Sequence, residues 1–387
     1  MKKLTVVIVS YNVRYYLEQC IVSVQRATED IDCEIFVVDN DSHDDTVGYL
    51  KERFGDQITL IESQHNLGFA RANNIAIRQT TSEYVLLLNP DTFVAEDSLR
   101  RVLDFMDQHP QAGGVGGRMH NGNGSLARES RRALPTPWVS LLKMLGFSRR
   151  YYMSHLSWDE PGRIDVMSGA FCMLRREALD RVGLLDEDFF MYGEDIDLSY
   201  RILKGGYENW YVPADILHYK GESTQKSSYR YVHVFYEAML IFFRKHYSHL
   251  SLLVTLPIKL AIYFRAFIAL CQMQYRRMVE SLGFGKGQTQ EEYTFVGSEA
   301  TLQECRELAR RKGLSATFRN GSEAMKAMPD EEGSGQKDVR SHTIVYDTST
   351  FSFAQIIADA CQRTTGEKVG TYFPSRGLLI TPEDIIQ

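Results

Sequence analysis

The sequence predicts an α/β fold in which a mostly parallel sheet is covered by helices on both faces. Short apolar runs rich in β-branched residues alternate with segments of helical periodicity over the first ninety residues, and this alternation is typical of parallel sheets. Polar residues follow several of these runs, at the strand ends where such sheets bind ligands. We therefore expect a large α/β domain with a ligand site at one edge of its sheet.

The predicted elements follow one another in a regular order. Strands are expected at 4–9, 33–38, 58–62 and 84–88, and helices at 13–26, 44–53 and 69–79. Further strands are expected at 165–174, 207–212 and 215–219, with helices at 177–182 and from 229 onward. Glycine is frequent between Gly113 and Gly124, and this density predicts a mobile loop there.

Composition and charge narrow the class of protein. The 387 residues carry a formal net charge of −6, which weighs against nucleic acid as the main partner. The six cysteines are scattered without metal-site spacing and are expected to be reduced thiols. The start, Met1-Lys2-Lys3-Leu4, leads directly into a strand pattern and lacks a signal-peptide cleavage region. These features predict a cytoplasmic protein.

Two apolar segments suggest contact with a membrane surface. The segment 250–270 is strongly apolar but contains Lys259 and Arg265, each costing roughly 2.5–3.5 kcal/mol at the centre of a span. An interfacial helix lying on lipid or on a partner is therefore expected, the alternative being a helix packed on the protein's own core. In the segment 138–152, leucines and Phe147 precede Arg149 and Arg150, which suits an anionic lipid surface.

A second α/β pattern follows a linker-like stretch, 281–291, rich in Gly and Gln. We predict a large domain at 1–245, an amphipathic helical segment with a linker at 246–290, and a small α/β domain at 291–387. The charged stretch 330–338 is expected to be a flexible insertion. Ser298, before a predicted helix, is interpreted as an N-cap in preference to a phosphate site.

The acidic run at 192–201 is the strongest functional signal. Glu194, Asp195 and Asp197 crowd the start of a predicted helix beside aromatic residues, which exceeds what capping requires. Such a cluster suits a general base in a sugar site, with Asp195 as the proton acceptor, Glu194 supporting it and Asp197 structural.

Three further side chains follow predicted strands. Asp91, after Asn89-Pro90, could hold a hard divalent cation on a diphosphate, the alternative being a capping turn. Asp39 could accept from a pyrimidine N–H or a ribose hydroxyl, or it could build an Asx turn. His218 could reach a diphosphate or a metal, or it could be a hydrogen-bonded structural residue.

Five ordered motifs carry a family resemblance. They are Val9-Ser10-Tyr11-Asn12, Val38-Asp39-Asn40-Asp41-Ser42-His43-Asp44, Asn66-Leu67-Gly68-Phe69, Leu88-Asn89-Pro90-Asp91 and Gly193-Glu194-Asp195-Ile196-Asp197-Leu198. Over residues 4–243 the chain resembles the family 2 glycosyltransferases of GT-A fold, most closely the rhamnosyltransferase-like members of bacterial surface-polysaccharide pathways. The C-terminal part lies outside the resemblance.

The resemblance implies an inverting transfer from a nucleoside-diphosphate sugar, dTDP-rhamnose-like or a UDP-sugar, to a saccharide acceptor, expected to be polyprenyl-linked. It implies Mg²⁺ or Mn²⁺ as cofactor, held by Asp91 with His218, and catalysis by Asp195 with Glu194. The implied nucleotide and substrate contacts are Ser10, Tyr11, Asn12, Asp39, Asn66, Arg71 and Asn89. We expect a peripheral protein on the inner face of the plasma membrane, and a homodimer is compatible with this role.

Two positions depart from the family pattern. Asn89 replaces the first carboxylate of the usual Asp-x-Asp, which would weaken metal binding. Asp45 stands where the family's turn usually has Gly, and Asp tolerates φ > 0. Two alternatives remain open. A sugar nucleotidyltransferase would need a Gly-rich basic phosphate loop where Ser10 to Val13 stand. A non-catalytic or regulatory nucleotide-sugar-binding protein would not need both Asp91 and Asp195.

Overall fold

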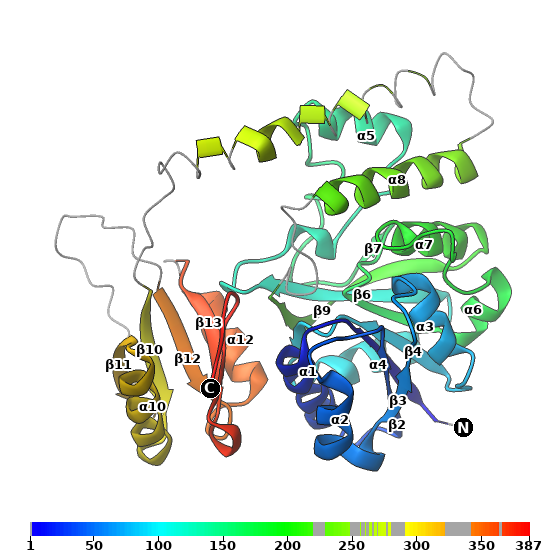
Figure 1. Cartoon of the computed structure of the whole chain (residues 1–387). Coiled ribbons are helices and arrows are strands. Elements are labelled where there is room, and N and C mark those ends of the chain that lie inside the picture. The colour runs from blue at the N-terminus through cyan, green and yellow to red at the C-terminus, as the bar shows by residue number, and fades with distance from the viewer. Residues whose placement is uncertain are drawn as a thin grey trace.

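Two β-sheets organise the molecule, a large one in the N-terminal part and a smaller one in the C-terminal part (Figure 1). This computed structural model describes residues 2–219, 229–247, 291–321, 342–363 and 366–387, together with scattered residues between 256 and 279. The predicted linker at 281–291 falls almost wholly outside the described residues, and the predicted insertion at 330–338 falls entirely outside them.

The large sheet has the predicted α/β, GT-A-type arrangement. Its strands are β1 (Leu4–Ser10), β2 (Cys33–Asp39), β3 (Thr59–Glu62), β4 (Tyr84–Leu88), β5 (Thr92–Val94), β6 (Ala112–Asn121), β7 (Gly162–Ile164), β8 (Phe171–Arg175) and β9 (Glu208–His218). Their order is β3-β2-β1-β4-β8-β6-β9-β5, and β7 pairs with β9. Strands β3, β2, β1 and β4 are mutually parallel, whereas β8 is antiparallel to both of its neighbours.

Helices cover both faces of this sheet. They are α1 (Arg14–Ala27), α2 (Thr46–Phe54), α3 (Phe69–Ile77), α4 (Ser98–Gln108), α6 (Arg176–Val182) and α7 (Glu194–Lys204). Helices α5 (Pro137–Met144) and α8 (Tyr229–His246) lie beyond α7 (Figure 1), and the short 3₁₀ turns are η1 (Gly55–Gln57) and η2 (Arg128–Ser130). Strand β1 is buried throughout, and its side chains alternate between two cores. Val6 and Ile8 pack with α1, α2 and α4, while Val7 and Val9 pack with α3, α6 and α7. A strand buried on both faces explains the continuous apolar run in the sequence.

The glycine-rich stretch 113–124 is not the mobile loop that we predicted. Most of it is β6, which pairs with β8 and β9 in the middle of the sheet. At several of these positions, neighbouring side chains leave no room for a Cβ atom. A Cβ on Gly114 would lie 2.4 Å from the sulfur of Met167, and one on Gly117 would lie 2.2 Å from Ile216. Glycine here marks close packing of a strand, which composition alone does not distinguish from a loop.

Two other strand predictions need correction. The strand expected at 165–174 forms only from Phe171, as β8, and before it lies a turn in which Phe171 N donates to Ser168 O. The two strands expected at 207–212 and 215–219 are one strand, β9. Its register against β6 shifts between Gly116 and Arg118, and Pro213, which has no N–H to donate, lies in this bulge.

The C-terminal unit forms its own mixed sheet. Its elements are β10 (Glu292–Gly297), α10 (Glu299–Lys312), β11 (Ser315–Asn320), β12 (His342–Asp347), α12 (Phe353–Gln362), β13 (Lys368–Phe373), η3 (Pro374–Arg376), β14 (Leu378–Ile380) and β15 (Ile385–Ile386). The strand order is β11-β10-β12-β13-β14-β15, with the first four parallel. Ser298 accepts a hydrogen bond from Thr301 N at 3.2 Å, as expected for an N-cap.

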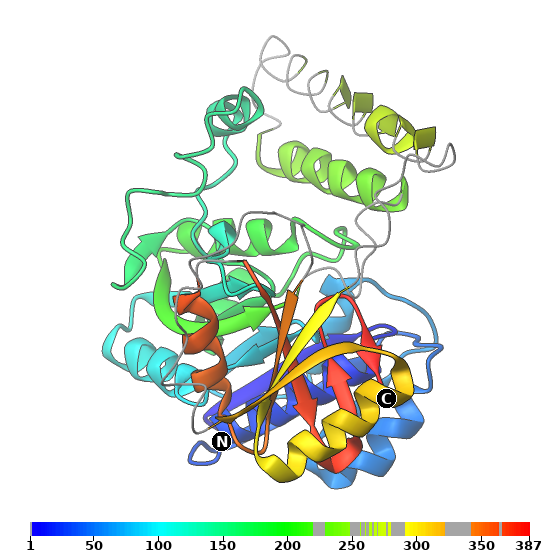
Figure 2. The ribbon, with the colours of Figure 1, turned by 90° about the vertical axis from the view of Figure 1, so that its left-hand side faces the viewer.

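The C-terminal unit packs directly on the large sheet's outer layer, and Figure 2 shows its strands in front of the N-terminal elements. One buried cluster joins Tyr16 and Phe93 of the N-terminal part to Phe353 and Ile380 of the C-terminal part. In addition, Tyr16 Oη donates to Thr381 O at 2.7 Å. The two sheets therefore share a core, and the domain boundaries that we placed at 245 and 290 remain a proposal.

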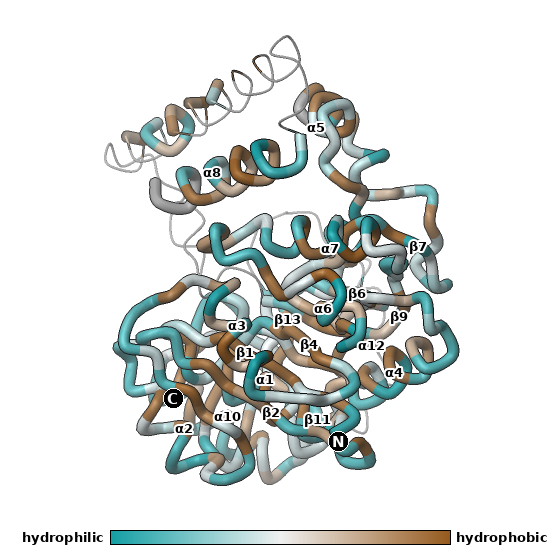
Figure 3. Tube along the Cα trace, turned by 90° about the vertical axis from the view of Figure 1, so that its right-hand side faces the viewer, coloured by the Kyte–Doolittle hydropathy of each residue, from teal (hydrophilic) through white to brown (hydrophobic). Residues whose placement is uncertain are grey.

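Hydrophobic residues are concentrated in the strands and recur along α5 and α8 (Figure 3). On and just after α5, the exposed fraction is 59% for Trp138 and 67% for Phe147. Leu256, Phe264 and Phe267 are also exposed. Within the part of the chain that the structure describes, no helix combines the length and the hydrophobicity needed to cross a membrane.

Candidate active site

The sheet brings together polar residues at the carboxyl ends of β1 and β2. Ser10 and Asp39 are partners in the register of these two strands. The Asp39 carboxylate is 2% exposed and accepts from Ser42 N at 3.0 Å through Oδ2. Its Oδ1 has no hydrogen-bond partner among the described residues. A buried carboxylate oxygen without a donor is costly unless a ligand supplies one, which suits the predicted contact to a nucleoside.

Asn12 ties the loops after these two strands together. It has φ of 55°, a conformation that Asn tolerates. Its Oδ1 accepts from His43 N at 2.7 Å, and its own N donates to Ser42 Oγ at 3.0 Å. Asp45, at the family's usual glycine position, has φ of 59°. The turn therefore survives the substitution, as the tolerance of Asp for positive φ predicts.

A second pair of loops meets beside Gly68. Asn40 Nδ2 donates to Asn66 Oδ1 at 3.0 Å, and Leu67 N donates to Asn40 Oδ1 at 2.8 Å. Gly68 has φ of 80°, and a Cβ there would lie 2.4 Å from the Phe190 carbonyl. Only glycine permits this approach. The loop of the third motif is thereby fixed against the segment that precedes the acidic motif.

Asp91 and His218 form a pair at the end of the sheet. Asp91 is 2% exposed, and its Oδ1 lies 3.2 Å from His218 Nε2. Asn89 Nδ2 lies 3.5 Å from the same ring nitrogen. The register Thr92↔His218 between β5 and β9 holds the two side chains together. The two predicted metal ligands are thus neighbours, although 127 residues of sequence separate them.

The acidic motif begins α7 after a strained turn. Tyr192 and Gly193 have φ of 68° and 87°, and a positive φ at a tyrosine is uncommon and often marks a functional site. Asp197 is 1% exposed and accepts from Arg201 Nε at 2.7 Å and from His246 Nε2 at 2.6 Å. Asp197 therefore ties α7 to α8, which agrees with the structural role expected for it.

Asp195 is paired with a buried arginine that the sequence analysis did not assign to the site. Arg132 Nη2 donates to Asp195 Oδ2 and to Met167 O, both at 2.5 Å. Gly169 N also donates to Oδ2 at 3.2 Å. Burial by itself lowers the pKa of Arg132, but the facing Asp195 carboxylate outweighs it and holds that pKa above its usual range. These hydrogen bonds fix the orientation of the Asp195 carboxylate.

Glu194 has a different environment from its neighbour. It is 5% exposed, and its Oε2 has no hydrogen-bond partner among the described residues. Burial, and next the negative charge of Asp195, raise the pKa of Glu194 to about 8. At neutral pH the raised pKa favours a protonated Glu194 beside the Asp195–Arg132 pair.

Two cavities meet at these carboxyl groups. A cavity of about 280 Å³ is lined by Tyr11, Asn66, Asn89, Asp91 and His218, together with Glu194 and Asp195. A second cavity of about 370 Å³ lies on the other side, between α5, α7 and α8, and is lined largely by apolar and aromatic side chains that include Phe235, Phe242 and Tyr151. Four residues line both cavities: Arg132, Tyr192, Glu194 and Asp195.

The structure does not bring every predicted residue to the cavity wall. Ser10, Asn12 and Asp39, at or just after the strand ends, are not among the residues that line this cavity. Arg71 is exposed on α3 and lies 3.7 Å from Glu187 Oε2. Conversely, Ser168 and Gly169, which were not expected at the site, line the first cavity. Phe69, the last residue of the third motif, lines it as well. Arg132 follows the glycine-rich stretch that we had predicted to be a mobile loop, so it was not expected at the site.

The residues present fit a divalent cation that also binds phosphate. Ligands in adjacent positions of an octahedral Mg²⁺ shell are about 3.0 Å apart, close to the 3.2 Å between Asp91 Oδ1 and His218 Nε2. Over the described residues, no group of three or more His, Cys, Asp or Glu side chains is arranged to hold a metal. Phosphate oxygens and water would therefore have to complete the shell, as they commonly do for Mg²⁺.

Comparisons with known proteins identify similar sequences and structures. The family model described as "Glycosyl transferase family 2" matches residues 5–183. The chain carries a glycosyl transferase family 2 domain. The matched residues make up a little less than half of the chain. The acidic motif at 194–197 lies beyond the matched residues.

Among curated proteins, the N-acetylglucosaminyl-diphospho-decaprenol L-rhamnosyltransferase of Mycobacterium tuberculosis is 29% identical over 266 residues, which is 63% of this chain and 85% of that protein. The poly-beta-1,6-N-acetyl-D-glucosamine synthase of Staphylococcus aureus is 26% identical over 181 residues, 46% of this chain and 41% of that protein.

Two solved structures are also similar. The S. aureus TarS fragment 1–349 has a TM-score of 0.41 and 18% identity, covering 62% of this chain and 65% of that one. The mannosyltransferase PcManGT from Pyrobaculum calidifontis, in complex with GDP-Man and Mn²⁺, has a TM-score of 0.46 and 19% identity, covering 81% of both chains.

Proposed function

We propose that this protein is an inverting glycosyltransferase that moves a sugar from a nucleoside-diphosphate sugar to a saccharide carried on a polyprenyl diphosphate. The observation that carries the proposal is the junction of the two cavities at Glu194 and Asp195. A polar cavity on one side and an apolar one on the other suit two substrates that meet at a shared acid–base group. In-line attack requires this arrangement of donor and acceptor.

The donor occupies the cavity beside the strand ends. The loops after the strand ends lie beside this cavity, and their hydrogen bonds involve Asp39 and the side-chain amides of Asn12, Asn40 and Asn66. Asp91 and His218 face the position of a diphosphate, where a divalent cation would neutralise the charge of the leaving nucleotide. A dTDP-rhamnose-like donor is our first choice and a UDP-sugar our second, since the mycobacterial relative is named a rhamnosyltransferase.

The acceptor occupies the apolar cavity between α5, α7 and α8. Its aromatic walls suit sugar faces and the first isoprene units of a lipid. Arg132 and Lys143 contribute positive charge to its lining, which suits a lipid diphosphate. The mycobacterial relative's name specifies a decaprenyl diphosphate acceptor, and this supports the same acceptor class here.

Asp195 then acts as the general base. Its carboxylate takes the proton from the acceptor hydroxyl while that oxygen attacks the anomeric carbon. The bond from that carbon to the diphosphate breaks on the opposite face, and the nucleoside diphosphate leaves with the electron pair. Arg132 keeps the carboxylate oriented toward the cavity junction, and protonated Glu194 limits the negative charge there.

The proposal also places the protein on the cytoplasmic face of a membrane. Trp138 and Phe147 are exposed on and after α5, and Arg149 and Arg150 beside them are exposed as well. Residues of α5 also line the apolar cavity. A lipid-linked acceptor could therefore enter from a membrane that contacts this surface.

The experiment that tests the function is a transfer assay with purified protein. We expect transfer from dTDP-rhamnose or a UDP-sugar to a synthetic GlcNAc-diphospho-polyprenol, dependent on Mg²⁺ or Mn²⁺ and abolished by chelation. Asp195→Asn is expected to lower kcat at least a hundredfold, the range of a lost general base. Asp91→Asn is expected to raise the metal concentration needed for half-maximal rate.

Asp180→Asn serves as the matched control, because Asp180 is an exposed carboxylate on α6, away from both cavities. It should keep wild-type activity. Undiminished turnover by Asp195→Asn would contradict the assignment of the base. Activity unchanged by exhaustive chelation would contradict the metal.

A further inference from the structure

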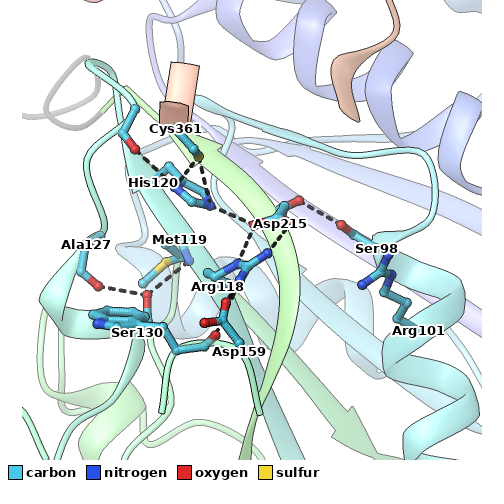
Figure 4. Close-up of polar contacts among 12 residues, drawn as sticks. Ser98, Arg101, Arg118, Met119, His120, Ala127, Ser130, Asp159, Asp215 and Cys361 are labelled. Atoms are coloured by element: carbon cyan, nitrogen blue, oxygen red, sulfur yellow. Dashed lines mark hydrogen bonds and ion pairs between the residues drawn. The ribbon is translucent and has the colours of Figure 1, made fainter. Parts of the chain in front are cut away.

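Outside both cavities, a cysteine, a histidine and an aspartate form a line across the boundary between the two sheets (Figure 4). Cys361, in the last turn of α12, has its Sγ 3.2 Å from Nδ1 of His120 on β6. His120 Nε2 lies 2.7 Å from Oδ1 of Asp215 on β9. Arg118 holds the same carboxylate through Nε at 2.6 Å and Nη2 at 2.8 Å.

The partners of His120 determine its charge. Its Nδ1 lies 3.2 Å from the Gly124 carbonyl, and its Nε2 faces the Asp215 carboxylate. Both of these groups can only accept hydrogen bonds, so both ring nitrogens must carry protons. Burial by itself lowers the pKa of His120, but hydrogen bonds to Asp215 and Cys361 outweigh it and raise the pKa to about 9. A buried imidazolium therefore faces the Cys361 sulfur at neutral pH.

Cys361 differs from the protein's other thiols. Cys20, Cys172 and Cys305 are buried, and Cys33 is partly buried, and burial raises the pKa of each of these thiols. Cys271 is exposed like Cys361. Cys361 therefore combines solvent access with a fixed cation at its sulfur, and these are the conditions that make a thiol nucleophilic.

The other charges near the cluster are paired. On β6, Arg118 is bound by Asp215 and by Asp159, whose carboxylate lies 2.8 Å from Nη1. On α12, Asp359 pairs with Arg363, which is also 3.3 Å from Glu367. The positive charge of His120 is thus shared between Asp215 and the sulfur, with no other carboxylate bonded to its ring among the described residues.

We propose that Cys361, activated by His120 and Asp215, is a covalent modification site that reacts with low-molecular-weight disulfides. The Cys361 thiolate attacks one sulfur of the disulfide and forms a new S–S bond. The original S–S bond breaks, and its electron pair leaves with the other sulfur as a thiolate, which takes a proton from solvent. His120 keeps both protons and holds the attacking thiolate in place.

The site lies at a tight seam between the two units. A Cβ on Gly124 would lie 2.3 Å from the Ala360 carbonyl, and Val369 N donates to Gly122 O at 2.7 Å. An adduct on the neighbouring Cys361 therefore strains the contact between α12 and the turn after β6. That turn continues into η2 and Arg132, which binds Asp195. The turn after β6 and the segment from η2 to Arg132 therefore connect the modified Cys361 to the proposed base, Asp195.

The test uses the full-length wild-type protein, with Cys271 as an internal reference. Iodoacetamide is applied in short pulses from pH 5.5 to 9, and alkylation of both cysteines is followed by peptide mass spectrometry. The rate of an ordinary thiol falls about tenfold per pH unit below pH 8.5. We expect Cys361 to react at least tenfold faster than Cys271 at pH 6, and glutathione disulfide to modify Cys361 first.

Two variants complete the experiment. His120→Asn is expected to bring the pH profile of Cys361 onto that of Cys271. His109→Asn, at a histidine bonded to Phe105 O outside the cluster, should leave the profile unchanged. Equal pH profiles for the two cysteines in folded wild-type protein would overturn the proposal, and this comparison holds even if His120→Asn fails to fold. An unchanged profile in folded His120→Asn would overturn it as well.

Discussion

Glu194 and Asp195 are adjacent in sequence but have different surroundings. Asp195 forms an ion pair with Arg132 at 2.5 Å, whereas the Glu194 carboxyl is buried and its pKa is raised to about 8. We expect wild-type turnover to fall above pH 8, because ionised Glu194 adds a second negative charge where a diphosphate leaves. Glu194→Gln should remove this alkaline fall while retaining more activity at pH 7 than Asp195→Asn. Steady-state rates from pH 6 to 9.5 measure both effects.

The raised pKa of Glu194 also predicts how the stability of the fold depends on pH. Because the folded-state pKa of Glu194 is raised, its favourable contribution is complete below about pH 4.5 and is lost as pH rises through about 8. Glu194→Gln should therefore flatten the decline in melting temperature across this pH window.

The activity of the same variant tests the choice of base. If Glu194→Gln lowered turnover a hundredfold at pH 7, Glu194 and not Asp195 would be the base.

At the scale of single residues, the sequence predicted a role correctly where that role depends on the residue's own motif and not on a contact with a distant residue. Asp39 and Asp91 follow predicted strands, so strand order alone predicted them at one edge of the sheet, and Asp195 was joined to them through its motif. Arg132 could not be found in this way, because its role depends on a contact 63 residues away with Asp195. Asp91 and His218 were expected together as metal ligands, but their closeness depends on the pairing of β5 with β9, which the sequence pattern did not predict.

Among the elements, β6 shows what glycine does in a packed strand. A Cβ on Gly117 would lie 2.2 Å from Ile216 and 3.0 Å from the Ala214 carbonyl, and Ile216 is fully buried. We expect Gly117→Ala to destabilise the protein by about 1–3 kcal/mol through overpacking. Chemical denaturation followed by circular dichroism measures the difference in unfolding free energy.

Gly116 provides a control within the same strand. A Cβ there would have its nearest neighbours at 3.9 Å, an ordinary contact distance, so Gly116→Ala should leave stability close to wild type. Equal losses for the two variants would mean that chain conformation, and not packing, explains the glycines. The contrast also explains our wrong loop prediction, since clashes at Gly117 arise from β9, which lies far along the sequence.

At the scale of the whole molecule, one side chain of the large unit caps a helix of the small one. Glu96 accepts from Phe353 N and from Ala354 N, both at 2.8 Å, so its carboxylate occupies the positive end of α12. Glu96→Ala should cost about 0.5–2 kcal/mol, as lost caps do. Faster amide exchange in α12 and β13 would reveal the loosened contact.

The adjacent Asp97 is a suitable control for Glu96. It pairs with Arg101 at 2.6 Å on an exposed surface, where such pairs contribute little. Asp97→Ala should therefore leave exchange in α12 unchanged. If Glu96→Ala also left it unchanged, the shared apolar cluster alone would hold the two units together.

The arrangement of the molecule also predicts where it meets its acceptor. Helices α5 and α8 and the described residues between 256 and 279 lie at one end, beyond α7 (Figures 1 and 2). On α5 and in the turn after it, the most exposed large apolar side chains whose exposure is described are those of Trp138, Leu145 and Phe147. We expect co-sedimentation with vesicles that contain phosphatidylglycerol, weakening as salt rises because Arg149 and Arg150 contribute electrostatically.

Replacing Trp138 and Phe147 together by Ala should reduce vesicle binding at least tenfold while leaving the fold intact, because both side chains are largely exposed and contribute little to the core. Leu126→Ala is the matched control, since Leu126 is 39% exposed and lies beyond β6, away from α5. It should bind vesicles like the wild type. If the double variant still bound equally well, lipid contact would not depend on α5, and the acceptor would have to enter the apolar cavity from another side.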